Sequence, residues 1–198
     1  MAQDTKEYIL QKAFKTFLIN GYDSTSMTIL QKEFAMSRGA MYRYFSGKEE
    51  LFQAVVDKFF WGLINFLHPQ YDKNITVIDL IDNKIKTLEN VANRLKQAEE
   101  FETVILNYNA FVVQASKHYP GFIDKFRNHR NAEMKQWEFA IRNSINKGEV
   151  RQDIDVEIMA KIFAKTLDYN QSSATTENTL TATKQKKILT YIYSLIKT

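Results

Sequence analysis

The sequence has no cysteine, which excludes disulfide bonds, thiolate zinc sites and cysteine nucleophiles. Its three histidines, His68, His118 and His129, are far apart in the chain and form no HExxH pair, and no carboxylates cluster at the spacing of metal ligands. There is also no glycine loop of the kind that cradles phosphates and no nucleophile elbow. We therefore expect a protein that is not an enzyme and that needs neither a metal nor a cofactor.

Prolines and glycines are scarce, with two and six among 198 residues. Few positions therefore interrupt a helix, and the high aromatic content favours a packed all-α protein. Long apolar runs are missing too, because Phe59–Leu67 is too short to span a bilayer. The first ten residues lack the apolar segment and cleavage site of a secretion signal. We expect a soluble, cytoplasmic protein.

The net charge of +4 argues only weakly for a nucleic-acid partner, and it is not concentrated at the N-terminus. The first 50 residues hold seven basic and six acidic side chains. The local balance is more informative. Between Lys32 and Lys48 there are four basic residues, with Arg38 and Arg43 among them, against the single acidic Glu33.

The rest of the chain is organised around the stretch Ser24–Phe52, which is typical of two short helices that meet at a tight turn. We predict helices over Thr28–Phe34 and Arg38–Tyr44, with the turn at Ala35–Ser37. The Ser37 hydroxyl is placed to cap the second helix. Apolar residues at spacings that close a small core are Leu30, Phe34, Met36, Met41 and Phe45.

The opposite face of the second short helix combines arginines, tyrosines and very small residues. Small residues let a helix approach the major groove closely, arginine reads guanine edges, and tyrosine hydroxyls reach phosphates. An ordinary helical hairpin whose aromatic residues only pack is the alternative. The residues predicted to face outward are Arg38, Gly39, Ala40, Tyr42, Arg43 and Tyr44.

Hydrophobic periodicity predicts the remaining helices. The helix that begins at Lys48 is apolar on nearly every side from Val55 to Leu67, which is typical of a buried helix. The predicted ranges are 4–19, 48–67, Val77–Leu95, Phe101–His118, Phe122–Lys147, Val156–Tyr169 and Thr183–Lys197.

Several separated blocks near the N-terminus resemble, in order and spacing, the signature of TetR-type (TetR/AcrR) transcriptional regulators. They are Gly21-Tyr22, Thr25–Met27, Ser37–Phe45 and Lys48–Phe52, and they cover about the first quarter of the chain.

Two positions depart from that pattern. Gln31 stands where such sequences usually carry a small residue, and Ala35 replaces the usual turn glycine.

The resemblance implies an all-α protein of about nine helices. A three-helix bundle with a helix-turn-helix would form a DNA-binding domain over residues 1–47, and a larger helical domain over 48–198 would bind a ligand and dimerise. It also implies phosphate contacts at the start of the second helix and at Lys48. The alternatives are that these hydroxyls only cap and that Lys48 is only solvated. The expected DNA-binding residues are Thr25, Ser26, Ser37, Arg38, Gly39, Ala40, Tyr42, Arg43, Tyr44 and Lys48.

Aromatic and polar residues alternate on the inner faces of the later helices, as an apolar small-molecule site requires. Aromatic residues at helical spacing also form ordinary cores, so both readings stay open. The candidate pocket residues are Trp61, Phe66, Asn107, Tyr108, Phe111, Gln114, His118, Met134, Trp137 and Tyr169.

The last two helices carry more apolar residues than one face buries in a chain of this size. A homodimer interface built as a four-helix arrangement explains the surplus, and burial within one chain is the alternative. The candidate interface residues are Ile158, Ile162, Phe163, Ile188, Ile192, Tyr193 and Leu195.

These observations favour a dimeric DNA-binding regulator, most simply a repressor that an apolar or amphipathic small molecule releases from a near-palindromic operator. The first alternative has the same fold but responds to a protein partner or to nothing. The second is a helical carrier or enzyme whose hairpin is incidental. The ligand, the operator and the regulated genes are not specified by the sequence.

Overall fold

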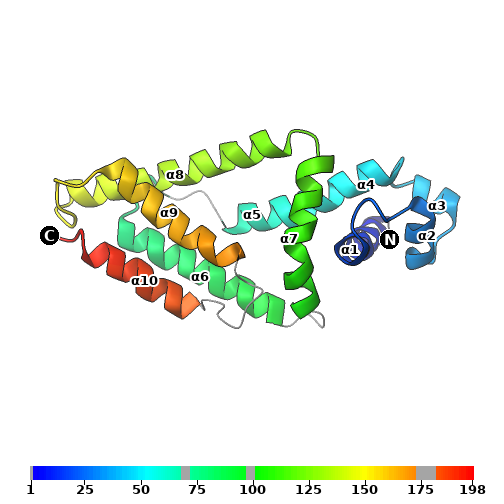
Figure 1. Ribbon diagram of the computed structural model, residues 1–198, viewed down its shortest axis with the longest axis horizontal. Helices are drawn as coiled ribbons and strands as arrows, with labels where there is room; N and C mark the ends of the chain where they lie inside the picture. The colour runs from blue at the N-terminus through cyan, green and yellow to red at the C-terminus, as the bar shows by residue number, and fades with distance from the viewer. Residues whose placement is uncertain (1, 68–71, 97–100, 173–181) are drawn as a thin grey trace. The chain divides into compact units, whose positions relative to one another are not determined.

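The computed structural model describes residues 2–67, 72–96, 101–172 and 182–198, and these residues are almost entirely helical (Figure 1). The predicted all-α class is confirmed, and the described chain adds only one isolated β-bridge, between Val150 and Lys197. The helices are α1 (Ala2–Asn20), α2 (Met27–Phe34), α3 (Arg38–Tyr42), α4 (Lys48–Val55), α5 (Gly62–Leu67), α6 (Val77–Lys96), α7 (Phe101–His118), α8 (Phe122–Asn146), α9 (Val156–Ser172) and α10 (Ala182–Ser194).

A π-helical segment, Val56–Trp61, joins α4 to α5, so Lys48–Leu67 is one continuous helical stretch. With this stretch counted once, the described chain has the nine helices that were expected. The stretch is not uniform, however. A π-helical segment inside an α-helix is uncommon. Two tyrosines bind here, Tyr108 of α7 and Tyr119 directly after it: the Tyr108 hydroxyl donates to the Phe59 carbonyl oxygen at 3.4 Å, and the Tyr119 hydroxyl donates to the side chain of Asp57, at Oδ1, at 2.7 Å.

The chain forms two compact units. Unit 1 comprises Met1–Asn65 and Glu102–Ile123, and unit 2 comprises Phe66–Phe101 and Asp124–Thr198. The domain boundary expected between residues 47 and 48 therefore does not coincide with a boundary between compact units. The reason is burial, because Leu51, Phe52 and Val55 of α4 are fully buried in the same core as α1.

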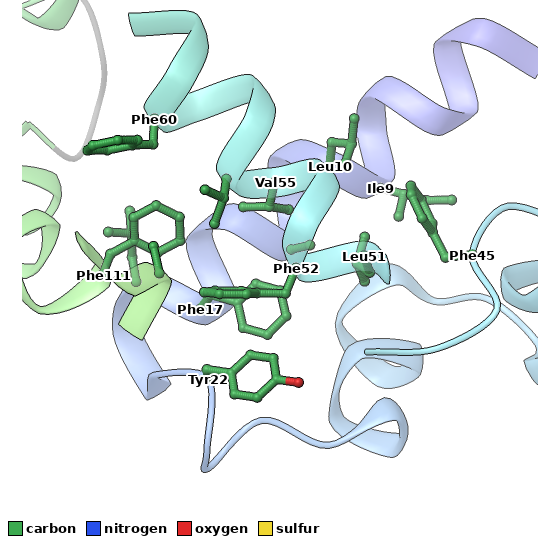
Figure 2. Packing of buried hydrophobic residues seen from close by; sticks show 14 of the residues in the cluster. Ile9, Leu10, Phe17, Tyr22, Phe45, Leu51, Phe52, Val55, Phe60 and Phe111 are labelled. Atoms are coloured by element: carbon green, nitrogen blue, oxygen red, sulfur yellow. The ribbon is translucent and has the colours of Figure 1, made fainter. Parts of the chain in front are cut away.

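The core of unit 1 is rich in aromatic side chains (Figure 2). Phe17 and Phe52 meet edge to face with ring centroids 5.0 Å apart, and Tyr22 lies 4.6 Å from Phe52. Phe111 of α7 reaches the same cluster, 5.7 Å from Phe52. Aromatic pairs at such distances stabilise beyond the area they bury, so α7 is an integral part of this core.

Unit 2 packs α6, α8, α9 and α10 around a mainly aliphatic core, in which α10 lies beside α6 and α9 (Figure 1). Trp137 is fully buried and stacks on Phe163 with ring centroids 4.8 Å apart. This unit also buries charge. Lys84 Nζ lies 3.1 Å from Glu133 Oε1, and Arg130 Nη1 lies 2.9 Å from Glu133 Oε2. A buried charge is tolerated only when it is paired in this way.

Helix α1 ends as the sequence predicts. Gly21 follows Asn20 with φ 74°, and its N–H donates to the Phe17 carbonyl oxygen. Glycine takes this left-handed conformation without steric cost, so it terminates the helix. Across the described ranges, none of the helices is both long and apolar enough to cross a membrane.

Candidate nucleic-acid interface

Helices α2 and α3 form a capped helix-turn-helix. The Ser26 hydroxyl accepts from the Ile29 N–H and begins α2, and the Ser37 hydroxyl accepts from the Ala40 N–H and begins α3. Ser26 is therefore the N-cap of α2. Each such cap satisfies one amide that the helix itself leaves unpaired.

The turn between the two helices passes through Ala35, whose backbone is left-handed with φ 50° and ψ 39°. Its N–H donates to the Lys32 carbonyl oxygen, and the Met36 N–H donates to the Gln31 carbonyl oxygen. These two bonds are the pattern of a Schellman cap, in which glycine is the usual left-handed residue. The sequence departs from the family pattern at this very position, and the alanine holds the turn at a steric cost.

The two helices close the small core that the apolar spacing predicts. Leu30, Phe34, Met41 and Phe45 are buried, and Met36 is half-buried against them. This packing fixes which side of α3 stays accessible. Ser37, Arg38, Gly39, Tyr42 and Arg43 are exposed.

Two residues expected on the exposed face are less accessible. Ala40 is half-buried, and Tyr44 is half-buried with its side chain packed against the core of unit 1. Tyr44 follows the last residue of α3, Tyr42, so helical spacing no longer places it on the outer face. The exposed Tyr42 ring instead lies 5.4 Å from the Arg38 guanidinium, a cation–π distance.

Gly39 is not required by the fold. A Cβ atom at this position would meet nothing within 4 Å. Glycine in a helix costs roughly 0.5–1 kcal/mol relative to alanine. Nothing inside the chain compensates for that cost, whereas a surface that approaches α3 from outside would benefit from the missing side chain.

Thr25 was expected to contact phosphate, but its side chain is not at the surface. It is buried, and its hydroxyl donates to the Gly21 carbonyl oxygen at 2.7 Å. Thr25 is buried because this hydrogen bond joins the α1–α2 loop to the end of α1. Ser26 is exposed and remains available at the start of α2.

Lys48, the other expected phosphate contact, is held by Tyr22. Its Nζ donates to the Tyr22 carbonyl oxygen at 3.0 Å and lies 4.0 Å from the centroid of the Tyr22 ring. The pKa of Tyr22 is raised by its burial and by the nearby carboxylates Glu49 and Asp23. The side chain of Lys48, the first residue of α4, is therefore held in one position.

The acidic start of α4 is tied down by hydrogen bonds. The Ser46 hydroxyl and N–H both donate to Glu50 Oε2, at 2.6 and 2.7 Å, and these bonds lower the pKa of Glu50. A carboxylate here also suits the helix dipole. The exposed Glu50 carboxylate is thereby bound to Ser46, while Lys48 and Glu49 lie beside it in the same helical turn.

Candidate pocket residues of unit 1 belong mostly to its core. Trp61 and Phe111 are buried, and burial raises the pKa of Tyr108 well above its ordinary value. Asn107 and Gln114 are half-buried, and the buried Gln114 Oε1 has no hydrogen-bond partner among the described residues.

His118, also expected in a pocket, is used elsewhere. Its ring stacks on Tyr22 with centroids 4.1 Å apart. No signal in the sequence pointed to this contact, because 96 positions separate the two residues and only the docking of α7 brings them together.

In unit 2, Met134 is half-buried and Trp137 is fully buried. The Trp137 Nε1 has no hydrogen-bond partner within the described part of the chain. The side chains of Phe66 and Tyr169 lie outside the described residues.

Candidate interface residues divide into two sets. Ile158, Ile162, Ile188 and Leu195 are exposed aliphatic side chains, as an interface needs. Phe163 and Tyr193, by contrast, are buried in the core of unit 2, and Ile192 is half-buried against it. These three already pack inside their own chain. Tyr191 of α10 is 64% exposed and was not among the predicted interface residues. It lies in an apolar run, in which the sequence alone does not separate exposed from buried side chains.

Residues 9–55 match the model of the tetR family of bacterial regulatory proteins. The HTH-type transcriptional regulator YuxN of Bacillus subtilis (strain 168) is 30% identical over 125 residues, which covers 58% of this chain and 40% of YuxN. The biofilm operon icaADBC HTH-type negative transcriptional regulator IcaR of Staphylococcus epidermidis is 27% identical over 89 residues, which covers 45% of this chain and 48% of IcaR. The chain thus spans less than half of the length of these curated relatives.

Among solved structures, the complex of SmeT with triclosan has a TM-score of 0.64 to this chain at 18% identity. The match covers 98% of this chain and 92% of SmeT, a repressor from Stenotrophomonas maltophilia. At this level of identity the likeness concerns the fold, and it extends over both units.

Proposed function

Because this chain belongs to the tetR family of bacterial regulatory proteins, we propose that it is a transcriptional regulator that reads duplex DNA with α3. The observation that carries the proposal is the exposed face of α3. Arg38 directly precedes Gly39, Arg43 directly follows α3, and both are exposed; a Cβ atom on Gly39 would meet nothing within 4 Å among the described residues. Arginine pairs with the two major-groove acceptors of guanine, and a helix without a side chain at one position approaches the groove more closely.

We propose that the regulator acts as a repressor and as a homodimer. IcaR, a relative, is a negative regulator. The exposed Ile158 and Ile162 of α9 lie one helical turn apart, which makes an apolar stripe, and α10 exposes Ile188, with Leu195 exposed directly after its last residue. A dimer that joins these stripes carries two copies of α3. It would bind a near-palindrome with half-sites about 34–36 Å apart or a multiple of that distance.

We also propose that an apolar or amphipathic small molecule releases the DNA. SmeT was solved with triclosan. In this chain, two buried polar atoms, Gln114 Oε1 in unit 1 and Trp137 Nε1 in unit 2, lack a hydrogen-bond partner among the described residues. Buried polar groups are nearly always paired, so a bound molecule that pairs with either group would be stabilised.

A second candidate is a regulator of the same fold that responds to a protein partner or to nothing. The packing of the candidate pocket residues favours it. Trp137 stacks on Phe163, and the Tyr108 hydroxyl already donates to Phe59. The two candidates differ in one property, which is whether any small molecule changes the affinity for DNA.

The test of DNA reading uses genomic fragments from the source organism to find a bound sequence, followed by fluorescence anisotropy on that duplex. Arg38→Ala should weaken binding to the preferred site by roughly 1–3 kcal/mol and relax specificity at one base pair. Arg127→Ala is the matched control, since Arg127 is an exposed arginine on α8 that pairs with Asp124. If Arg38→Ala and Arg127→Ala have equal effects, α3 does not read the DNA.

The test of release measures ligand affinity with and without the DNA duplex. If the ligand weakens DNA binding by a given factor, DNA must weaken ligand binding by the same factor. This factor is typically about 5–150-fold. Trp61 and Trp137 are the only tryptophans and report binding by their emission. Equal ligand affinities in the two titrations would favour the second candidate.

A further inference from the structure

The C-terminal end of α7 contacts the α1–α2 loop, which leads into the helix-turn-helix, mainly at the ring of Tyr22. The His118 imidazole stacks on the Tyr22 ring with centroids 4.1 Å apart and planes 28° apart. Lys48 Nζ lies 4.0 Å from the centroid of the same ring. Both groups therefore lie against the Tyr22 ring.

The Tyr22 ring is fixed on its remaining sides. Phe52 lies 4.6 Å away and Phe17 lies 6.0 Å away, both from the core of unit 1 (Figure 2). His118 Nε2 also lies 3.2 Å from Asp23 Oδ1, within ion-pair distance although not aligned as a hydrogen bond. His118 thus touches two consecutive residues of the α1–α2 loop, Tyr22 and Asp23.

Lys48 depends on this arrangement for its position. Within the described ranges, its Nζ donates to the Tyr22 carbonyl oxygen and makes a cation–π contact with the Tyr22 ring, so both restraints come from Tyr22. The lysine lies beside Ser46 and Gly47 at a surface hollow of about 480 Å³. A lysine that is held in place before binding loses less side-chain freedom when it meets a phosphate.

We propose that His118 is a positioning residue for DNA binding: it holds the Tyr22 ring in place, and Tyr22 in turn holds Lys48 where it meets the DNA backbone. The inference rests on the proposed function, and it adds a regulatory consequence. Tyr108 of α7 and Tyr119, which directly follows α7, also bind the π-helical segment. Any event that shifts the end of α7 therefore releases Lys48 and weakens binding to every DNA sequence alike.

The first measurement is DNA affinity at fixed salt. His118→Ala should weaken binding roughly two- to tenfold on specific and non-specific duplexes alike, the range that the cost of ordering one long side chain predicts. His118→Phe keeps an aromatic ring on Tyr22 and should restore most of the affinity. Val113→Ala, an exposed position on the same helix, is the matched control and should change nothing.

A double substitution separates positioning from a merely structural role. If His118 acts through Lys48, His118→Ala should have no further effect on DNA affinity in a Lys48→Ala background. If it still weakens binding there by the same factor, the positioning role is overturned. It is also overturned if His118→Ala leaves the affinity of the parent chain unchanged.

The second measurement needs no DNA. Acetylation of the free protein with acetic anhydride, followed by peptide mass spectrometry, gives the rate for Lys48 relative to the exposed Lys32. The relative rate should rise in His118→Ala and not in His118→Phe, and an unchanged rate would overturn the inference. If the parent protein bound no DNA at all, the proposed function would fail, and the acetylation rates would still show whether His118 holds Lys48.

Discussion

In unit 1 the described buried side chains are apolar apart from two threonines, and Arg38 and Arg43, at the two ends of α3, are exposed. In unit 2, by contrast, Lys84 and Glu133 are buried together. Both units expose aliphatic side chains, so the difference between them lies in what they bury. A buried charge is tolerated only while it is paired, whereas an exposed ion pair adds little to stability. The contrast therefore predicts where the loss of a single charge is most costly.

The largest effect should come from breaking the buried charge pair of unit 2. Glu133→Ala leaves Lys84 without its carboxylate and should destabilise the unit by about 3–5 kcal/mol. Urea unfolding followed by Trp137 emission, in a Trp61→Phe background, reports on unit 2. The double variant Lys84→Met/Glu133→Leu should lose less, because the two fully buried charges are removed together and only the partly exposed Arg130 loses a partner. Asp124→Ala, which breaks an exposed pair on the same helix, should cost at most about 1 kcal/mol. Equal costs for Glu133→Ala and Asp124→Ala would contradict the contrast.

The exposed aliphatic stripe of unit 2 is the next target. Ile158→Glu would place a charge in the proposed interface and should weaken dimerisation at least tenfold, or about 1.4 kcal/mol. Analytical ultracentrifugation over a concentration series measures this change. Ile123→Glu is a matched control, since Ile123 and Ile158 are both 55% exposed. A parent chain that is monomeric at all concentrations would show that the stripe serves another purpose.

A smaller effect, of opposite sign, is expected in unit 1. Ala35→Gly removes the steric cost of a left-handed alanine and should stabilise the unit by about 1 kcal/mol. Ala40→Gly, in ordinary helical backbone, should instead destabilise it by roughly 0.5–1 kcal/mol. Urea unfolding followed by Trp61 emission, in a Trp137→Phe background, measures both. If both glycine variants destabilise the unit, the turn at Ala35 is not strained.

The smallest effect concerns pH and treats the two units alike. Hydrogen bonds from the Thr76 hydroxyl and N–H lower the pKa of Asp79 in unit 2, just as those from Ser46 lower the pKa of Glu50 in unit 1. A carboxyl whose pKa is lowered by folding stabilises the protein fully above its ordinary pKa. This contribution is lost as the pH falls through the lower folded value. Asp79→Asn should therefore reduce the loss of unit 2 stability below about pH 4. If Asp79→Asn lost as much stability below about pH 4 as the parent chain, this prediction would be contradicted.

Many of the helix bounds could be predicted from residues close together in the sequence. The bounds of α7 were predicted as observed, and those of α6 and α8 to within one residue at either end. Caps and breakers account for this accuracy: Ser26 and Ser37 begin helices, and Gly21 and Gly148 follow the ends of α1 and α8 with positive φ. The helix-turn-helix was identified because its cap, turn and apolar spacing all lie within thirty residues of one another.

Tertiary packing decided the rest, because it joins residues that no local pattern relates. Thr25 reads as a surface cap, yet the loop buries it against Gly21. Phe163 and Ile158 share one apolar helix, and only packing shows that Phe163 lies in the core and Ile158 at the surface. Lys84 meets Glu133 across 49 positions, and His118 meets Tyr22 only where α7 docks. Local sequence sets which segments become helices, whereas burial, which depends on every helix at once, sets which of their residues remain accessible to a partner.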